Sequence, residues 1–386
     1  MRNRVAKPLR FTHLSVENWR NFASVRVDLE GRVFLVGPNA SGKSNFLDVF
    51  RFLHDIGAVG GGFHEAVRRR GGVSRIRCLA ARRHPDICIR VLVGSDEDPR
   101  LWEYELRFGQ DQQRTPRIRS EHVSRAGTRI LQRPDEEDKA DPQRLTQTYL
   151  EQVNVNRDFR ELCDAFQTVR YLHIVPHLVR DPERSVGKTN DPFGGDFLEQ
   201  VAQTNDRTRT AWLRRIREAL TFAVPQLTEL ELWRDARGTA HLRGRYEHWR
   251  PQGAWQTESD FSDGTLRLIG LLWAVLAGSG PLLLEEPELS LHPEVVRHIP
   301  RMLARIQRRS GRQIVLSTHS SDLFRDEGIG LDEVLLLEPE SEGTAVKPAS
   351  DYQQVKALLD GGLSLADAVI PQTSPKKAHQ LTLFGD

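Results

Sequence analysis

The feature that most constrains this chain is a glycine-rich stretch that lies between an apolar segment and a helical pattern. It matches the phosphate-binding pattern G-x-x-x-x-G-K-[ST] at every fixed position, and its residues are Gly37, Pro38, Asn39, Ala40, Ser41, Gly42, Lys43 and Ser44, followed by Asn45. Residues 32–36 are apolar and β-branched, which indicates a buried strand. After the loop, apolar side chains recur at helical spacing over residues 46–53. Strand, loop and helix together predict a nucleotide-binding site.

Each part of this loop has a physical task. Glycines let successive backbone N–H groups turn toward phosphate oxygens, and the helix N-terminus adds its partial positive charge. Lys43 is expected to reach the β- and γ-phosphates, and the Ser44 hydroxyl is expected to ligate Mg²⁺. A chance glycine-rich turn is the alternative, which the flanking strand and helix disfavour.

Composition sets the bounds of the chain. Its 386 residues suggest two or three domains. The net charge is only +2, so overall charge does not indicate a nucleic-acid binder, although clustered arginines suit phosphate recognition as well as solvated helix faces. Three cysteines cannot close a disulfide framework, and we expect reduced, buried thiols. No signal-peptide run or membrane-length apolar stretch is present, which favours a soluble, cytoplasmic protein.

The order of the patterns predicts a split core. Two alternating segments, 9–16 and 24–29, precede the loop as a hairpin, and from residue 261 strands alternate with helices as in a mostly parallel sheet. Between them, residues 74–131 suggest an antiparallel meander, residues 133–144 a charged loop, and residues 145–169 and 197–223 helices. We therefore expect an ATPase-type core at 1–56 and 255–340, an inserted α+β lobe at 57–254, and an extension with a flexible tail at 341–386.

Two carboxylates follow the apolar strand predicted at residues 282–284. Glu285 and Glu286 would lie at the carboxyl end of that strand, where ligands of open α/β sheets bind. Neighbouring residues of a strand point to opposite sides, so the two can act separately. We assign Glu285 to the metal and Glu286 to the activation of the attacking water. Without the phosphate loop, a helix N-cap region would explain the pair equally well.

Two further patterns are less specific. His319 follows a second buried strand, where its ring N–H could touch a γ-phosphate, although a strand-end histidine can also be structural. Ser262 is a good N-cap for the helix predicted at 266–276, and Gly264 would allow a phosphate to approach the backbone. A simple capping motif explains the second pattern equally well.

The order of these motifs resembles that of the RecF/SMC/ABC-type P-loop ATPases, in particular the stand-alone RecF-like ATPases of the AAA class. The resemblance covers residues 9–53 and 260–338 through Glu17-Asn18-Trp19-Arg20-Asn21-Phe22, the loop 37–45, Phe261-Ser262-Asp263-Gly264-Thr265, the stretch 284–293 and Ser317-Thr318-His319-Ser320. It implies an α/β head with a mostly parallel core sheet and an antiparallel edge. It also implies ATP and Mg²⁺ as cofactors and a homodimer in ATP.

The resemblance gives individual residues their roles. In this class Ser262 and Gly264 would cap the γ-phosphate of a partner subunit in trans, and Glu286, His319 and Lys43 would be catalytic. Glu285 stands where an aspartate is usual, so a longer side chain would face the metal. The usual glutamine loop is not placed by pattern, and Gln167 is its candidate.

Two biological roles are compatible with such a head. The first is a DNA-associated ATPase of recombination and repair, and the second is the ATPase component of a phage-defence or toxin system that works with a separate effector. We expect any nuclease to be another chain, because fewer than 70 residues follow His319 and they hold no acidic cluster suited to two metals. The long insertion and the hairpin disfavour a transporter motor.

The C-terminal tip carries one more motif. Residues 371–379 are polar and proline-broken, which predicts disorder, yet the chain then ends with apolar side chains. Gln380, Leu381, Leu383 and Phe384 resemble the pentapeptide with which bacterial replication and repair proteins dock on the DNA sliding clamp. Packing of the tip on its own sheet is the alternative.

Overall fold

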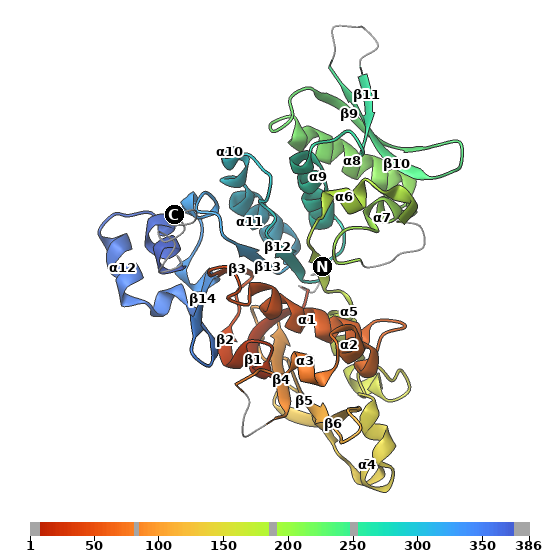
Figure 1. Ribbon diagram of the computed structural model, residues 1–386, viewed down its shortest axis with the longest axis vertical. Coiled ribbons are helices and arrows are strands. Elements are labelled where there is room, and N and C mark those ends of the chain that lie inside the picture. The colour runs from red at the N-terminus through yellow and green to blue at the C-terminus, as the bar shows by residue number, and fades with distance from the viewer. Residues whose placement is uncertain (1–7, 81–84, 185–190, 248–253, 374–386) are drawn as a thin grey trace, which may run out of the picture. The chain divides into compact units, whose positions relative to one another are not determined.

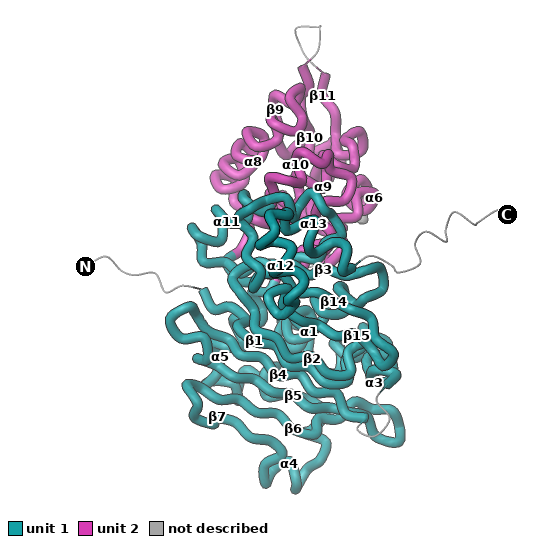
Figure 2. The backbone as a smooth tube through the Cα atoms, turned by 90° about the vertical axis from the view of Figure 1, so that its left-hand side faces the viewer, with its two compact units in different colours: residues 1–169, 279–283, 300–386 teal, residues 170–278, 284–299 magenta. Residues whose placement is uncertain are grey.

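The computed structural model describes residues 8–80, 85–184, 191–247 and 254–373. The chain forms two compact units, coloured separately in Figure 2: unit 1 holds residues 1–169, 279–283 and 300–386, and unit 2 holds residues 170–278 and 284–299. Figure 1 shows the helices and strands of both units with their labels.

The first sheet of unit 1 joins the N-terminal hairpin to the meander. Its strand order is β2-β1-β4-β5-β6-β7, with every neighbouring pair antiparallel. The strands are β1 (Arg10–Trp19), β2 (Phe22–Asp28), β4 (Ile87–Gly94), β5 (Trp102–Gln110), β6 (Pro116–Arg125) and β7 (Thr128–Arg133). The meander is therefore confirmed, but it continues the hairpin sheet. The predicted boundary at residue 57 falls inside unit 1, and the predicted domains, which stay a prediction, differ from the compact units.

The second sheet carries the phosphate-loop strand in its interior. Within unit 1 its order is β15-β14-β3-β13-β12, and in unit 2 β8 follows β12. Strand β3 is parallel to both β13 and β14, as predicted for the core, and β15 pairs antiparallel with β14. The strands are β3 (Arg32–Val36), β8 (Arg170–Leu172), β12 (Leu282–Glu285), β13 (Ile314–Thr318), β14 (Val334–Glu340) and β15 (Gly343–Pro348).

Helix α1 (Lys43–Gly57) follows the phosphate loop and is buried along most of its length. Its apolar side chains continue into an aromatic cluster: the Phe50 ring lies 4.7 Å from Phe11 of β1 and 5.8 Å from Phe46. Phe166 of α5 (Arg160–Gln167) stacks on Phe11 at 5.7 Å. Burial of such side chains stabilises a fold by about 1.5–3 kcal/mol each. This packing fixes α1, and with it the end of the phosphate loop, against the first sheet.

The other helices of unit 1 are short. They are α2 (Phe63–Arg69), α3 (Val73–Ile76), α4 (Glu136–Ala140), α11 (Ile299–Ser310, which begins one residue before unit 1 resumes), α12 (Gln353–Asp360) and α13 (Leu365–Val369). The strand expected from residue 74 is wrong, because Gly71 and Gly72 adopt φ of +83° and +89° and lead into α3 instead. The helix expected at 145–169 is confirmed only as α5.

The charged stretch from Arg133 is ordered, against the expectation of a loose loop. The Arg133 guanidinium is fully buried and donates to Glu121 at 2.9 Å and to Asp138 at 2.8 Å. Its plane also lies 3.9 Å from the Tyr149 ring centroid. A charge can be buried when it is paired and hydrogen-bonded, which composition alone does not reveal.

Unit 2 contains a three-stranded antiparallel sheet, β11-β10-β9, beside helices. The strands are β9 (Leu227–Arg234), β10 (Ala240–Tyr246) and β11 (Ala254–Thr257), and the first two form a hairpin. The helices are α6 (Pro176–Val179), α7 (Phe197–Gln203), α8 (Asp206–Leu220), α9 (Asp263–Leu276) and α10 (Pro293–Val296). Apolar side chains of α8 and α9 are buried, with Trp212 and Trp273 5.2 Å apart.

Three smaller expectations concern the whole chain. Cys78, Cys88 and Cys163 are free and buried, as predicted, and burial raises the pKa of the Cys88 and Cys163 thiols to about 12. Among the residues with a described position, no helix is long and apolar enough to cross a membrane. The tail motif at residues 380–384 lies outside the described residues.

Candidate nucleotide-binding site

The phosphate loop is a tight turn between β3 and α1. Ala40 and Gly42 both adopt positive φ, at +63° and +98°, and a positive φ is strained for residues that carry a Cβ. A Cβ on Gly37 would come within 2.5 Å of the Ser41 hydroxyl and 2.7 Å of the Leu337 carbonyl. The fixed glycines of the pattern are therefore required by the space and the backbone geometry of this loop.

The polar groups inside the loop suit an anion. The Lys43 side chain is buried, and its ammonium donates to the carbonyl oxygens of Gly37 at 3.0 Å and Pro38 at 3.1 Å. The Ser41 hydroxyl is fully buried and finds no hydrogen-bond partner within the described part of the chain. A buried cation held by neutral carbonyls, next to an unsatisfied hydroxyl, is a site that phosphate oxygens would satisfy.

An asparagine from the hairpin holds this loop in place. Asn21 Nδ2 donates to the Ser41 carbonyl at 2.8 Å and to Thr344 Oγ1 at 2.8 Å, and Asn21 Oδ1 accepts from Asn45 Nδ2 at 2.8 Å. Trp19 Nε1 donates to the Asn45 carbonyl at 2.9 Å. The hairpin motif thus holds the second half of the loop, from Ser41 to Asn45. The sequence indicated this motif only through its resemblance to a family. Its contacts show that it holds the phosphate loop in place.

Replacing Asn21 by alanine should weaken nucleotide binding by about tenfold, because the buried Ser41 carbonyl and Asn45 amide each lose a partner worth ~1–3 kcal/mol. Titration with a fluorescent ATP analogue measures the change. Asn205→Ala is the control, since that asparagine caps α8 through Arg207 N and its loss should lower stability alone. Equal affinity losses in both variants would contradict a specific role for Asn21.

His319 belongs to the same unit as the loop. It follows β13 directly, and Thr318 at the end of that strand pairs with Val36, the residue before Gly37. The His319 side chain is exposed, and it takes part in further interactions. The parallel pairing therefore brings the two strand ends to the same edge of the sheet, as the pattern predicted. The role of His319 toward a γ-phosphate stays a prediction.

The acidic pair lies in unit 2, at the end of β12. Glu285 is the last residue of the strand, and Glu286 adopts a positive φ of +44°, so the chain turns sharply between them. Such backbone conformations are uncommon for residues other than glycine and cluster at functional sites. Tyr171 of β8 donates a hydrogen bond to Glu285 Oε2, and His173 Nδ1 lies 3.2 Å from the Glu285 carbonyl oxygen. Neither contact followed from the sequence.

The signature turn is built in the same unit. Ser262 caps α9 by accepting from Thr265 N at 3.2 Å, and a Cβ on Gly264 would lie 2.5 Å from the Ser290 carbonyl. Arg180 donates to the Phe261 carbonyl at 2.7 Å and to Asp263 at 2.6 Å. Capping alone explains the Ser262 contact. The glycine, in contrast, is needed because the loop after the acidic pair packs against it.

Arg267, one turn further along α9, is a residue whose place the sequence did not indicate. Partial burial lowers the pKa of its guanidinium, whereas the carboxylates of Asp263, Glu286 and Glu288 act in the opposite direction. The signature helix and the acidic loop therefore share an electrostatic environment within unit 2.

Gln167, the candidate for the glutamine loop, donates to the Gly57 carbonyl at 2.7 Å and ties α5 to the end of α1. This contact gives it a structural role.

The described residues contain no group of three or more His, Cys, Asp or Glu side chains placed to hold a metal ion. Mg²⁺ is usually bound by one or two protein ligands together with substrate phosphates. The Ser44 hydroxyl and the Glu285 carboxylate are oxygen donors of the kind it prefers. Ser44 belongs to unit 1 and Glu285 to unit 2, and their roles toward Mg²⁺ stay a prediction.

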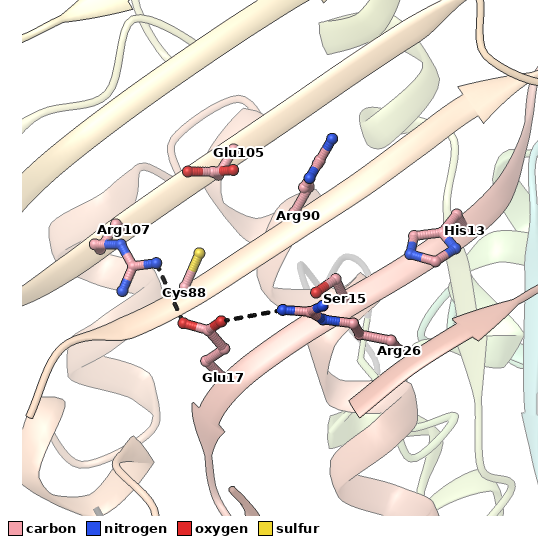
Figure 3. Close-up of a pocket in the computed structure, with 8 residues that line it drawn as sticks. All are labelled: His13, Ser15, Glu17, Arg26, Cys88, Arg90, Glu105 and Arg107. Carbon is pink, nitrogen blue, oxygen red and sulfur yellow. Dashed lines mark hydrogen bonds and ion pairs between the residues drawn. The ribbon is translucent and has the colours of Figure 1, made fainter. Parts of the chain in front are cut away.

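A separate pocket lies on the polar face of the first sheet (Figure 3). It has a volume of about 270 Å³ and is lined by His13, Ser15, Glu17, Arg26, Cys88, Arg90, Glu105 and Arg107. Glu17 accepts from Arg107 at 3.2 Å and pairs with Arg26 at 3.9 Å, while Arg90 pairs with Glu103 at 2.9 Å. Its arginines are thus neutralised by nearby carboxylates, and no phosphate-loop residue lines it.

The fold matches those of solved Smc head domains. One is an Smc head bound to the C-winged helix domain of ScpA, with a TM-score of 0.53, 13% identity and coverage of 87% of this chain and 96% of that one. Another is the Smc head domain with an extended coiled coil, bound to the C-terminal domain of ScpA, derived from Pyrococcus furiosus. It has a TM-score of 0.54, 11% identity and coverage of 92% and 100%. At such identities the likeness concerns the fold, and it defines an SMC-head-like α/β fold.

The family follows from the sequence itself. Residues 32–326 match the model of the family described as AAA domain, putative AbiEii toxin, Type IV TA system. The chain belongs to this family, and it is a P-loop ATPase of the RecF/SMC/ABC type. A curated relative, Endonuclease GajA of Bacillus cereus (strain VD045), is 38% identical over 47 residues, which are 12% of this chain and 8% of that protein's length.

Proposed function

We propose that this chain binds ATP with Mg²⁺, hydrolyses ATP to ADP and phosphate, and forms a homodimer while ATP is bound. The observation that carries the proposal is the phosphate loop. Its buried Lys43 ammonium donates to the carbonyls of Gly37 and Pro38, and the Ser41 hydroxyl has no hydrogen-bond partner within the described part of the chain. Family membership and the SMC-head-like fold support the same activity.

The proposed roles follow the chemistry of phosphoryl transfer, which depends on positioning and charge stabilisation. Lys43 would bind the β- and γ-phosphates, and Ser44 and Glu285 would hold Mg²⁺, which offsets the charge of the phosphate oxygens. Glu286 would take the proton of the attacking water as the bond from the γ-phosphorus to its bridging oxygen breaks. His319 would donate its ring N–H to the γ-phosphate. In a dimer, Ser262 and the backbone at Gly264 would cap the partner's γ-phosphate.

The activity is tested by phosphate release from the purified chain with ATP, with and without Mg²⁺. Mg²⁺-dependent turnover that is lost in Ser44→Ala supports the proposal. Turnover that persists in that variant would assign it to a contaminating enzyme.

For the biological role, we propose action on DNA in recombination or repair. The support is the RecF-like motif order and the SMC-head-like fold. DNA should stimulate ATP turnover, and the stimulation should fall steeply with salt, because phosphate contacts release counterions. Stimulation by DNA that does not depend on salt, or no stimulation at all, would remove this role.

The second candidate is the ATPase component of a phage-defence or toxin system with a separate effector protein. The family description names a putative toxin of a type IV TA system, and the partial relative is named an endonuclease. A neighbouring effector gene whose product co-purifies with this chain would favour this role. Co-expression of both genes, with Lys43→Ala as the inactive control, would test whether ATP binding arms the effector.

The tail offers a further discriminating prediction. We propose that Leu383 and Phe384 fill an apolar pocket of the DNA sliding clamp while Gln380 makes a hydrogen bond nearby. Burying each of the two side chains is worth ~1.5–3 kcal/mol, so micromolar affinity is expected after ordering costs. A pull-down with the host clamp should retain the full chain and lose a chain that ends at His379. Equal retention of both, or of neither, contradicts the prediction.

A further inference from the structure

The acidic strand ends with a glutamate, Glu285, rather than with the shorter aspartate. A glutamate has one more rotatable bond than an aspartate, so its carboxylate explores more positions unless another group restrains it. In unit 2 such a restraint is present, because the Tyr171 hydroxyl donates to Glu285 Oε2. We infer that Tyr171 is a positioning residue, whose hydroxyl restrains the Glu285 carboxylate and would thereby orient it toward the Mg²⁺ that accompanies a bound nucleotide.

The segment that carries Tyr171 is itself anchored. His173 N donates to the Pro192 carbonyl at 3.0 Å and Val175 N to the Phe193 carbonyl at 3.1 Å. His173 Nδ1 also lies 3.2 Å from the carbonyl of Glu285, so two side chains of this segment meet the same acidic residue. A hydroxyl held by an anchored backbone can orient its acceptor, because its own position is fixed.

The same segment also contacts the signature helix. A Cβ on Gly270 of α9 would come within 1.6 Å of Ile174 Cδ1, so helix and segment pack in close contact. Six residues further on, Arg180 holds the signature turn through Phe261 and Asp263. Residues 171–180 thus link the acidic strand to the signature helix within unit 2.

The inference rests on the proposed role of Glu285 as a metal-holding residue. Tyr171→Phe keeps the ring and removes only the hydroxyl. Since second-sphere hydrogen bonds typically change metal affinity by ~10–100-fold, the Mg²⁺ concentration that half-saturates its effect on nucleotide binding should rise by about tenfold. The measurement is the affinity of the full chain for N-methylanthraniloyl-ATP across a Mg²⁺ series, with EDTA as the baseline. Affinity in EDTA and the melting temperature should match those of the wild type.

A matched control and a second variant make the test specific. Tyr149→Phe removes the same hydroxyl from another tyrosine–carboxylate pair, with Asp135 at 3.1 Å, and should leave the Mg²⁺ midpoint unchanged. Glu285→Asp retracts the carboxylate from Tyr171 while keeping its charge, and should raise the midpoint similarly. Because the two changes remove one shared contact, the double variant should be no worse than the poorer single variant. Additive shifts would overturn the inference.

The remaining outcomes distinguish the positioning role of Tyr171 from the metal role of Glu285. If Glu285→Gln raises the midpoint and Tyr171→Phe does not, the positioning role is wrong and the proposed function stands. If neither variant changes the Mg²⁺ midpoint, the metal role of Glu285 is wrong, and the positioning role of Tyr171 is wrong with it. A Tyr171→Phe variant with lower affinity in EDTA and a lower melting temperature would show a structural role only.

Discussion

Lys43→Ala should reduce the affinity for ATP by about 100-fold or more, because the phosphates lose one or two charge-assisted hydrogen bonds worth ~1.5–3 kcal/mol each. The wild-type ammonium is buried and bound to the carbonyls of Gly37 and Pro38, so it is already positioned inside the loop. Phosphate oxygens would replace these neutral acceptors with charged ones. Titration with N-methylanthraniloyl-ATP in the presence of Mg²⁺ measures the loss.

The control for this variant is Lys139→Ala. Lys139 is an exposed lysine of α4 whose ammonium pairs with Glu136 at 2.6 Å, so its removal changes the net charge equally without touching the loop. It should bind ATP like the wild type. Both melting temperatures should be recorded, because the Lys43 variant leaves two loop carbonyls without their partner. Wild-type affinity of a folded Lys43→Ala chain would sink the assignment of the phosphate loop.

What the sequence predicted best is local. The phosphate loop, the strand before it and the helix after it depend on neighbouring residues, such as the glycine at position 42 that adopts φ of +98°. The strand pattern of the meander and the parallel core likewise follow from alternation and from apolar runs that lie close together in the chain. These elements are present in the structure with ends that differ by one to a few residues.

What the sequence did not predict is mostly non-local. Strand β1 pairs with β4 across a stretch that contains the phosphate loop, α1, α2 and α3, so the hairpin and the meander become one sheet. The contacts of Asn21 join residues 20 and 323 positions apart in the sequence. Pairings at such separations leave no periodic pattern, and a side chain that holds a distant loop looks like any polar turn residue.

The sequence-based prediction was also wrong for charged side chains that are buried in the structure. Arg133, Glu121 and Asp138 each look exposed by type, yet together they form an enclosed, hydrogen-bonded cluster. Tyr171 is a similar case at the candidate site, since a tyrosine in a short strand predicts only a partly buried ring. The sequence does not show that the Tyr171 hydroxyl donates a hydrogen bond to the Glu285 carboxylate.

The second large effect is expected at Glu286. Glu286→Gln should bind ATP normally and hydrolyse it at least ~100-fold more slowly, the usual contribution of a general base. The amide can still accept a hydrogen bond from water, but it cannot take the proton. The residue sits at a positive φ of +44°, and glutamine has the same backbone demands as glutamate, so the fold should be kept. Phosphate release and nucleotide titration measure the two properties separately.

The same variant should accumulate as a dimer in ATP. Two symmetric sites, each with two trans contacts from Ser262 and Gly264, would give roughly 6–12 kcal/mol at ~1.5–3 kcal/mol per charge-assisted hydrogen bond. Association costs about 4–15 kcal/mol in lost freedom. Because the sums are similar, the γ-phosphate can decide between monomer and dimer, and blocked hydrolysis would hold the dimer. Light scattering with ATP, with ADP and without nucleotide should show dimers in ATP alone.

Two matched variants make this result decisive. Glu294→Gln changes an exposed glutamate of α10 that pairs with Arg297 at 3.0 Å, and it should turn over ATP and accumulate no more dimer than the wild type. Glu285→Gln tests the division of roles, because a trapped dimer there, with none in Glu286→Gln, would exchange the two assignments. In a Glu286→Gln chain with ATP bound, the γ-phosphate remains in place because hydrolysis is blocked. If that chain stays monomeric at high micromolar concentration, the trans contacts to the γ-phosphate do not form, and the head-to-head dimer is refuted.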